Sequence, residues 1–318
     1  MRFIRSARSQ PGRLCGRGLP RSRRGISRLM SAQQSPTYQD LFYRSEDGLT
    51  LYARDYPAPV PDAQCVLLMH GLSRNSRDFG ILADRLSRHY RVLVAEQRGR
   101  GKSDWDTDPA RYTIPNYVRD MFTLLKAANV NRVATVGTSM GGLIAMIMNS
   151  AMPGVFSHVV LNDIGPELCD DGLNRIKGYV GQGGPVTTWT EAVAYNRRIN
   201  EVAFPTLSDE GWEQFARQIF KEIDGVPVLD YDPRISEVVN AEDSDAVPPD
   251  LWPLFDLLAK QPLMLIRGAL SDLLDTRITA EMQRRVPVMT YLEVADVGHA
   301  PMLKDAAVIA AIEEFFNQ

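Results

Sequence analysis

Hydrophobic residues follow two alternating patterns along this chain. Short continuous runs are typical of strands that are buried on both faces. Such runs occupy residues 65–69, 92–95, 133–136 and 159–161. The segments between them carry hydrophobic residues every three or four positions, the spacing of a helix with one buried side. These helical segments are residues 79–86, 117–127 and 142–150. The alternation predicts an α/β fold class, with a mostly parallel, doubly wound central sheet covered by helices on both faces.

Both ends of this pattern extend the predicted sheet. Residues 41–45 and 49–56 alternate hydrophobic and polar side chains around Glu46-Asp47-Gly48, which indicates a β-hairpin before the first buried strand. Further strands are predicted at 263–266 and 290–294, with a helix at 276–285 between them. A final helix is predicted over residues 306–316.

The strand rhythm stops between residues 165 and 261. Helical segments at 190–201 and 209–223 are separated there by turns rich in glycine and proline. We therefore expect a core formed by residues 36–164 and 262–318, divided by an inserted helical lid over residues 165–261. We interpret the aromatic residues of this lid as its own core rather than as pocket walls. They are Trp189, Tyr195, Phe204, Trp212 and Phe215.

Charge is distributed very unevenly. Nine of the 36 Lys and Arg residues lie in residues 1–29, which hold no acidic residue, so the rest of the chain has 27 basic against 39 acidic residues. Residues 1–35 are expected to be an arginine-rich disordered leader or a misassigned start upstream of Met30. A mitochondrial transit peptide is the alternative, although glycine and proline interrupt any helix there. We expect a cytoplasmic protein, or a mitochondrial one if the leader is a transit peptide.

Composition excludes several classes of protein. The acidic body disfavours nucleic acid as a partner. No run reaches the 18 apolar residues of a membrane span, so no span is expected. Cys15, Cys65 and Cys169 have no paired spacing, which argues against a disulfide framework or a zinc site. The sequence leaves the oligomeric state open.

The pentapeptide Gly137-Thr138-Ser139-Met140-Gly141 joins a buried strand to a helical segment. A G-x-S-x-G turn in this position is sharp, and its small flanking residues let the backbone pass while the serine hydroxyl stays exposed at the sheet edge. Ser139 is therefore the candidate nucleophile. A serine hydroxyl is a poor nucleophile at neutral pH and needs a base that accepts its proton.

His299 is the candidate base among the four histidines of the chain. It follows the last predicted strand, where the strand ends of an open α/β sheet form the ligand crevice. His89 and His158 lie in polar connections and are expected at the surface. His70 ends a buried strand and is expected to shape the following loop rather than to take protons.

Asp272 is the favoured acid that would orient His299. It lies in a loop after a buried strand and therefore at the same sheet edge. Asp163, in Leu161-Asn162-Asp163-Ile164-Gly165, is the competing candidate, and Asp275 and Asp296 are also available, although either can instead cap a helix or solvate a turn.

Two backbone N–H groups are expected to form an oxyanion hole. The turn supplies the N–H of Met140, and the loop Met69-His70-Gly71-Leu72-Ser73 after an earlier strand supplies that of Leu72.

The order Ser139, Asp272, His299, with His70-Gly71 upstream, an inserted lid and the segment from Gln97 to Asp104, resembles the α/β-hydrolase superfamily over residues 38–317. Within it the chain resembles the lidded serine hydrolases, which include enol-lactonases, carboxylesterases, hydrolases of ring-cleavage products and haloperoxidases. The resemblance implies an enzyme that cleaves a small ester or lactone without a metal or organic cofactor.

The same resemblance leaves three alternatives. They are carbon–carbon bond hydrolysis of ring-cleavage products, cofactor-free perhydrolysis, and ligand binding without catalysis. Glu96 stands where the family usually has Asp, a structural position where little consequence is expected. Arg98 and Arg100 lie in the family's structural turn, and we expect packing or surface roles for them rather than contact with an anionic substrate.

Overall fold

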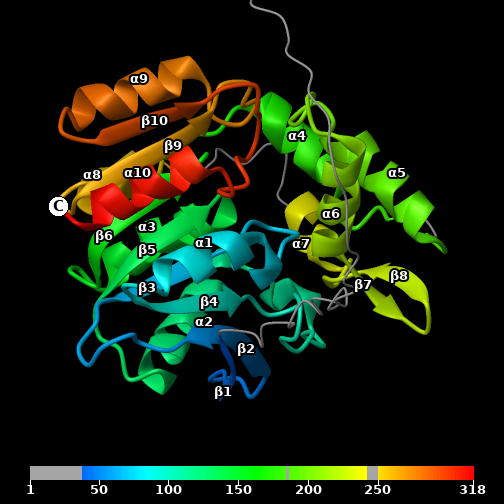
Figure 1. Cartoon of the computed structure of the whole chain (residues 1–318), viewed down its shortest axis with the longest axis horizontal. Coiled ribbons are helices and arrows are strands. Elements are labelled where there is room, and N and C mark those ends of the chain that lie inside the picture. Colours follow the sequence, from blue (N-terminus) through cyan, green and yellow to red (C-terminus); the bar gives the residue numbers. More distant parts are fainter. Residues whose placement is uncertain (1–37, 184–185, 242–249) are drawn as a thin grey trace, which may run out of the picture. The chain divides into compact units, whose positions relative to one another are not determined.

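An eight-stranded sheet forms the centre of the protein (Figure 1). The computed structural model describes residues 38–183, 186–241 and 250–318. The strands are β1 (Gln39–Arg44), β2 (Thr50–Tyr56), β3 (Cys65–Met69), β4 (Arg91–Glu96), β5 (Val133–Thr138), β6 (Phe156–Asn162), β9 (Leu263–Gly268) and β10 (Thr290–Val294). Their spatial order is β1-β2-β4-β3-β5-β6-β9-β10. Strand β2 pairs antiparallel with β1 and β4, and every other neighbouring pair is parallel, so the predicted α/β fold class is confirmed.

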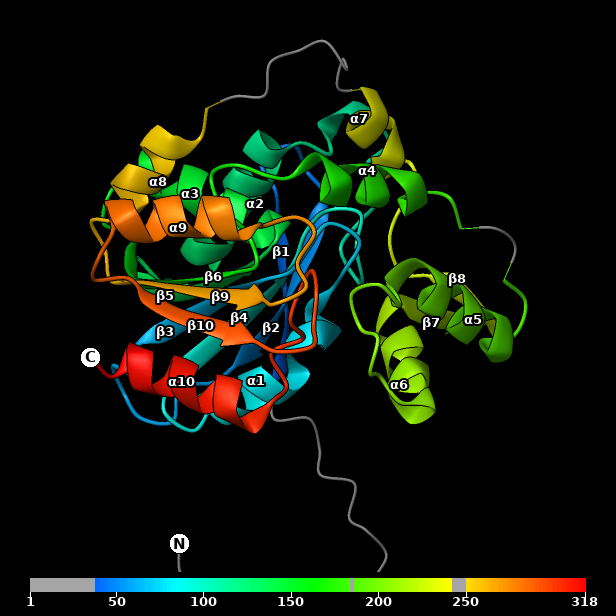
Figure 2. The same ribbon diagram turned by 90° about the horizontal axis from the view of Figure 1, so that it is seen from above.

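Helices cover both faces of this sheet (Figure 2). On one face lie α1 (Gly80–Leu86), which packs on β4, and α10 (Ala306–Phe316), which packs on β10, and both share a hydrophobic cluster with the buried strands between them. On the other face lie α2 (Ile114–Ala127), α3 (Met140–Ala151), α8 (Trp252–Leu258) and α9 (Thr276–Arg285). All five residues of β3 are buried, as a strand covered on both faces requires. By its packing, α8 belongs to this layer, although its sequence lies inside the expected insertion.

The rest of the insertion lies beyond the carboxyl ends of the parallel strands (Figure 2). It contains α4 (Asp170–Tyr179), α5 (Trp189–Asn200), α6 (Asp209–Ile219), β7 (Phe220–Ile223), β8 (Val226–Leu229) and α7 (Ile235–Ala241). Helices α5 and α6 and strand β7 share a hydrophobic cluster of their own, which includes Tyr195, Phe204, Trp212 and Phe215. The insertion therefore has a separate small core placed over the edge of the sheet where active sites of open α/β sheets form.

The segment expected as one helix over residues 209–223 is a helix followed by half of a hairpin. Helix α6 ends at Ile219, and β7 pairs antiparallel with β8. Asp224 and Gly225 join the two strands, both with positive φ (50° and 82°). A two-residue hairpin turn favours Asp-Gly, so this dipeptide indicates the hairpin. The helical spacing of the residues before it led us to extend the predicted helix through β7.

The arginine-rich leader expected over residues 1–35 lies outside the described residues. Within the described residues, none of the helices combines the length and the apolar character that crossing a membrane requires.

Helix α3 packs so tightly on β3 that Gly141 has no room for a side chain. A Cβ on Gly141 would lie 2.2 Å from the Met69 carbonyl oxygen. We expect Gly141→Ala to lower the free energy of unfolding by about 1–3 kcal/mol, measured by urea denaturation, because backbone atoms must shift. Gly178→Ala is the matched control, since nothing lies within 4 Å of its Cβ position in helix α4. It should be neutral or stabilise by up to about 1 kcal/mol. Equal stabilisation by both variants would contradict this account.

Candidate active site

Ser139 occupies a sharp turn between β5 and α3. Its backbone has φ 52° and ψ −118°, a conformation that residues other than glycine rarely adopt. Its N–H donates to the Asn162 carbonyl (3.0 Å). A Cβ on Gly137 would lie 2.6 Å from backbone atoms of Gly141, so both flanking glycines are required by close contact. The chain folds this way because small residues let the helix begin directly above the strand.

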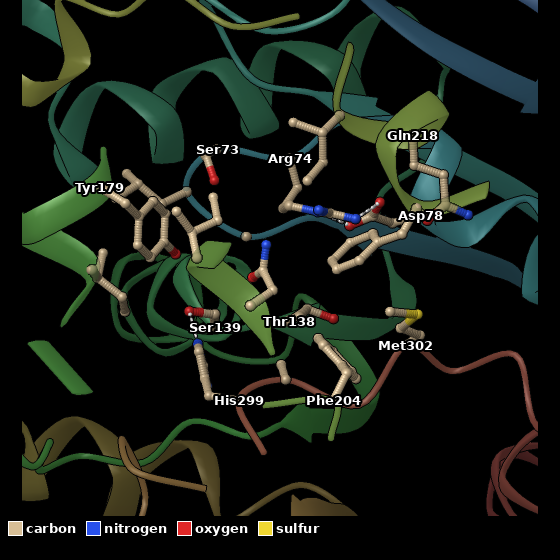
Figure 3. Close-up of a pocket in the computed structure, with 18 of the residues that line it drawn as sticks. Ser73, Arg74, Asp78, Thr138, Ser139, Tyr179, Phe204, Gln218, His299 and Met302 are labelled. Atoms are coloured by element: carbon tan, nitrogen blue, oxygen red, sulfur yellow. Dashed lines mark hydrogen bonds and ion pairs between the residues drawn. The ribbon is translucent and has the colours of Figure 1, made fainter. Parts of the chain in front are cut away.

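His299 and Ser139 point toward each other across the pocket (Figure 3). His299 lies in the loop after β10, and its Nε2 is 2.9 Å from Ser139 Oγ. The imidazole is largely shielded from solvent, with 8% of the side chain exposed. This geometry suits proton transfer from the hydroxyl to the ring.

Asp163 holds the other ring nitrogen of His299. It follows β6 directly, with φ 56°, and its Oδ2 is 2.8 Å from His299 Nδ1. The carboxylate is fully buried and also accepts hydrogen bonds from the Gly268 N–H (2.8 Å) and Ser271 Oγ (2.6 Å). Three donors therefore fix its orientation. An Nδ1 that donates to this carboxylate leaves Nε2 free to accept the serine proton.

Asp272, the acid that the sequence favoured, forms no hydrogen bond or ion pair with His299 within the described residues, although the charge of His299 acts on it from a longer distance. Its carboxylate pairs with Arg175 of α4, with Arg175 Nη2 donating to Oδ1 at 2.9 Å. Burial raises the pKa of Asp272, but the hydrogen bonds and charge of Arg175 outweigh it and lower the pKa below its usual value. The structure thus corrects the expected geometry and places Asp163 beside the histidine.

Position relative to the strand end distinguishes the two carboxylates. Asp163 is the first residue after β6, whereas Asp272 lies four residues beyond the end of β9. Because of the intervening residues, Asp272 lies beside Arg175 of α4, a helix that was not predicted from the hydrophobic pattern. Asp275 is the N-cap of α9 and accepts a hydrogen bond from the Ile278 N–H (2.7 Å), the capping role considered for it.

The two expected oxyanion donors lie on segments that flank Ser139. A Cβ on Gly71 would be 3.6 Å from Ser139 Cβ, so the loop that carries Leu72 packs directly against the turn that carries Met140. Neither the Leu72 N–H nor the Met140 N–H donates a hydrogen bond to any of the residues that the structure describes. Both groups are therefore available to a ligand, and their role as an oxyanion hole stays a prediction.

His70 is buried beneath the loop that carries Leu72 and forms hydrogen bonds with the backbone on both of its ring nitrogens. Its Nδ1 is 2.7 Å from the Gly71 carbonyl oxygen, and its Nε2 accepts from the Gln97 N–H (3.1 Å). Burial lowers the pKa of His70 to about 4, so the ring is neutral at pH 7. Of the other histidines, His89 is exposed, and His158 is half-buried against the rings of Phe315 and Phe316.

A pocket of about 100 Å³ opens over Ser139. Its walls are mainly apolar, and aromatic lid residues contribute to them, although we expected these residues only in the lid core. Tyr195, Phe204 and Phe215 belong both to the lid cluster and to the pocket wall, whereas Trp212 is buried in the cluster alone. Tyr195, Phe204 and Phe215 therefore both pack the lid and line the pocket.

One ion pair interrupts the apolar wall. Arg74 Nη2 donates to Asp78 Oδ1 (2.6 Å) and Nε donates to Oδ2 (2.7 Å) (Figure 3). The guanidinium lies 4.4 Å over the ring of Phe215. Across the described ranges, no three His, Cys, Asp or Glu side chains gather as a metal site would require. The expectation of catalysis without a cofactor stays a prediction.

These features define the class of protein. The model of the alpha/beta hydrolase family matches residues 66–312, which is more than half of the chain. The chain belongs to this family, as its resemblance predicted, and it is a hydrolase.

Three individual proteins are similar to this chain over most of its length. The chain is 37% identical over 255 residues to a 3-hydroxybutyrate-oligomer hydrolase from Cupriavidus necator, which covers 78% of this chain and 86% of the relative. A crystal structure of an alpha/beta hydrolase from Novosphingobium aromaticivorans is 38% identical, covers 89% of this chain and 99% of its own, and superposes with a TM-score of 0.84. A 2-(acetamidomethylene)succinate hydrolase from Mesorhizobium japonicum is 24% identical over 235 residues, covering 74% of this chain and 81% of the relative.

Proposed function

We propose that the protein is a serine hydrolase that cleaves a carboxylic ester through a covalent acyl-enzyme. The observation that carries this proposal is the unbroken series of contacts from Ser139 Oγ to His299 Nε2 (2.9 Å) and from His299 Nδ1 to Asp163 Oδ2 (2.8 Å). A hydroxyl, a base and an orienting acid in this order can activate the serine.

The first half-reaction forms the acyl-enzyme. His299 takes the proton of Ser139 as Oγ attacks the ester carbonyl carbon, and the electron pair of the carbonyl bond moves to its oxygen. The N–H groups of Leu72 and Met140 donate to that oxyanion. The ester C–O bond then breaks, and protonated His299 gives its proton to the departing alcohol, while Asp163 stabilises the imidazolium that exists between these steps.

The second half-reaction releases the acid. His299 removes a proton from water, whose oxygen attacks the acyl carbon, and the same two N–H groups donate to the second oxyanion. Ser139 Oγ leaves with the proton from His299, and the carboxylic acid product forms.

The substrate class that we propose is an ester of a short hydroxy acid. The name of the Cupriavidus necator relative, a 3-hydroxybutyrate-oligomer hydrolase, favours it. The pocket is consistent with it, since apolar walls suit a short alkyl chain and Arg74 with Asp78 adds one donor and acceptor pair without net charge. Within the described part of the chain, Arg74 Nη1 has no hydrogen-bond partner, so it can donate to a neutral oxygen such as a hydroxyl.

Removing the nucleophile tests the reaction type. Ser139→Ala should lower kcat/KM for p-nitrophenyl butyrate by at least about 1,000-fold and abolish labelling by a fluorophosphonate probe, because no other group can form the acyl-enzyme. Ser73→Ala, a serine in the same pocket, is the matched control and should stay within about threefold of the unchanged enzyme. Full turnover by Ser139→Ala would contradict the proposal, and absence of labelling in the folded unchanged protein would favour a ligand-binding protein on this fold.

The two rival carboxylates can be compared directly. Asp163→Asn should lower kcat by about 1,000- to 10,000-fold, since an amide in this position no longer stabilises the imidazolium. Asp272→Asn should retain activity within about threefold, because its partner is Arg175. Both are measured by steady-state kinetics, with circular dichroism as the check on folding. The opposite ranking would assign the acid role to Asp272.

The polar pair in the pocket provides a test of the substrate class. Arg74→Met should lower kcat/KM for a 3-hydroxybutyryl ester by about 10-fold and change that for the matching butyryl ester by less than about twofold, because only the first substrate offers a hydroxyl to the pair. Arg119→Met, at an exposed arginine of α2, is the matched control and should change neither. An equal loss with both esters would show that the pair does not recognise the hydroxyl.

A further inference from the structure

Arg100 is a buried cation that the reaction described above does not use. It lies in the turn after β4, no part of it is exposed, and it is among the largest fully buried side chains of the described protein. We expected Arg100 to have a packing or surface role, and the structure shows that it is internal. A buried guanidinium is costly to desolvate, so its partners indicate what it does.

All the hydrogen-bond acceptors around Arg100 are neutral. Its Nε donates to the Leu72 carbonyl (2.9 Å), and Nη1 donates to the Arg98 carbonyl (2.7 Å) and to Tyr117 Oη (2.8 Å). Its Nη2 lies 3.9 Å from Met140 Sδ. The rings of Tyr112 and Tyr117 lie 5.7 and 4.9 Å from the guanidinium carbon.

The neighbouring arginine of the same turn is different. Arg98 forms ion pairs with Asp47, Asp106 and Asp120, so its charge is compensated. No carboxylate among the residues that the structure describes forms an ion pair with Arg100. Arg100 therefore keeps an uncompensated positive charge inside the protein, where electrostatic interactions are weakly screened.

Two of these contacts are with the two residues whose N–H groups we assign to the oxyanion. We propose that Arg100 is a positioning residue for the oxyanion hole: it fixes the Leu72 backbone through its carbonyl, contacts the side chain of Met140, and places a positive charge behind both donors. This inference rests on the proposed serine-hydrolase function. Its physical basis is that donors held in place before the reaction, in a region of low dielectric, stabilise charge that develops only in the transition state.

The role predicts a specific kinetic signature. Fixed donors and a buried charge act on the oxyanion and not on the neutral ester, so their loss lowers kcat and leaves KM nearly unchanged. A role limited to packing would instead lower the fraction of folded enzyme, and the folded molecules would retain full kcat per active site.

The test compares Arg100→Met and Arg100→Lys with Arg91→Met, a half-buried arginine of β4 that pairs with Asp55. Active sites are titrated with the fluorophosphonate probe, and kcat and KM are measured with p-nitrophenyl butyrate. We expect Arg100→Met to lower kcat per titrated site by about 10- to 100-fold with KM within threefold. Arg100→Lys should recover part of this loss because it keeps the charge, and Arg91→Met should leave kcat unchanged.

Tyr117→Phe provides a milder variant should Arg100→Met fail to fold. It removes one acceptor of the guanidinium, and we expect a fall in kcat of about threefold with KM unchanged. Unchanged kcat per site in Arg100→Met, or in Tyr117→Phe together with Arg100→Lys, would overturn the role of Arg100. If Ser139→Ala is inactive while these variants are fully active, only the inference on Arg100 fails; if Ser139→Ala retains turnover, the proposed function itself fails.

Discussion

The close contact between the start of helix α3 and the ends of two buried strands controls the geometry of this site. Gly141 lies against the Met69 carbonyl of β3, and Gly137 of β5 lies against the backbone of Gly141, at distances that no Cβ would permit. This contact turns the chain so sharply that Ser139 takes a positive φ and exposes its hydroxyl at the carboxyl edge of the sheet. The same contact brings the Gly71 loop beside Ser139, so the candidate nucleophile and both candidate oxyanion donors depend on one packing constraint.

The positions of Ser139 and His299 and the choice of the acid beside His299 depend on different features of the chain. The position of Ser139 follows from local residue size, and that of His299 from the last strand, so both could be found from the sequence. The acid could not be chosen in this way, because several carboxylates follow strand ends. Asp163 reaches His299 since it is buried where β6 ends, whereas Asp272 is occupied by Arg175 from an insertion helix. The position of Asp272 after a strand does not reveal its ion pair with Arg175, because Arg175 lies on a helix that was not predicted.

The fold itself was largely predictable because buried parallel strands have a distinctive pattern. Runs such as 65–69 and 133–136 are almost entirely hydrophobic and are buried at every position, which few other elements require. The insertion was predicted in part, because α5 and α6 each have one hydrophobic side that packs on the small separate core, and both were found from that periodicity. Helix α4 was missed although Leu173 and Ile176 have the spacing of a helix with one buried side, because the helix has only 10 residues and few of them are hydrophobic. The turn at Asp224-Gly225 was predictable from its dipeptide, but the helical pattern before it was extended too far.

The loops that surround the candidate active site also hold the insertion. Just after the Leu72 loop, Asn75 and Arg77 donate to the Gln218 carbonyl at the end of α6, and Arg77 pairs with Asp230. In the turn after β4, the N–H of Gly101 donates to the Asp230 carbonyl, and the backbones of Arg100 and Tyr231 form an isolated antiparallel β-bridge. The part of the pocket wall that the insertion supplies and the candidate oxyanion donor Leu72 are thus held by the same two segments of the core. In the proposed mechanism, Arg100 therefore joins the insertion, through Tyr231, to the Leu72 backbone, so the wall of the pocket and the candidate oxyanion donor are connected through one buried side chain and its backbone.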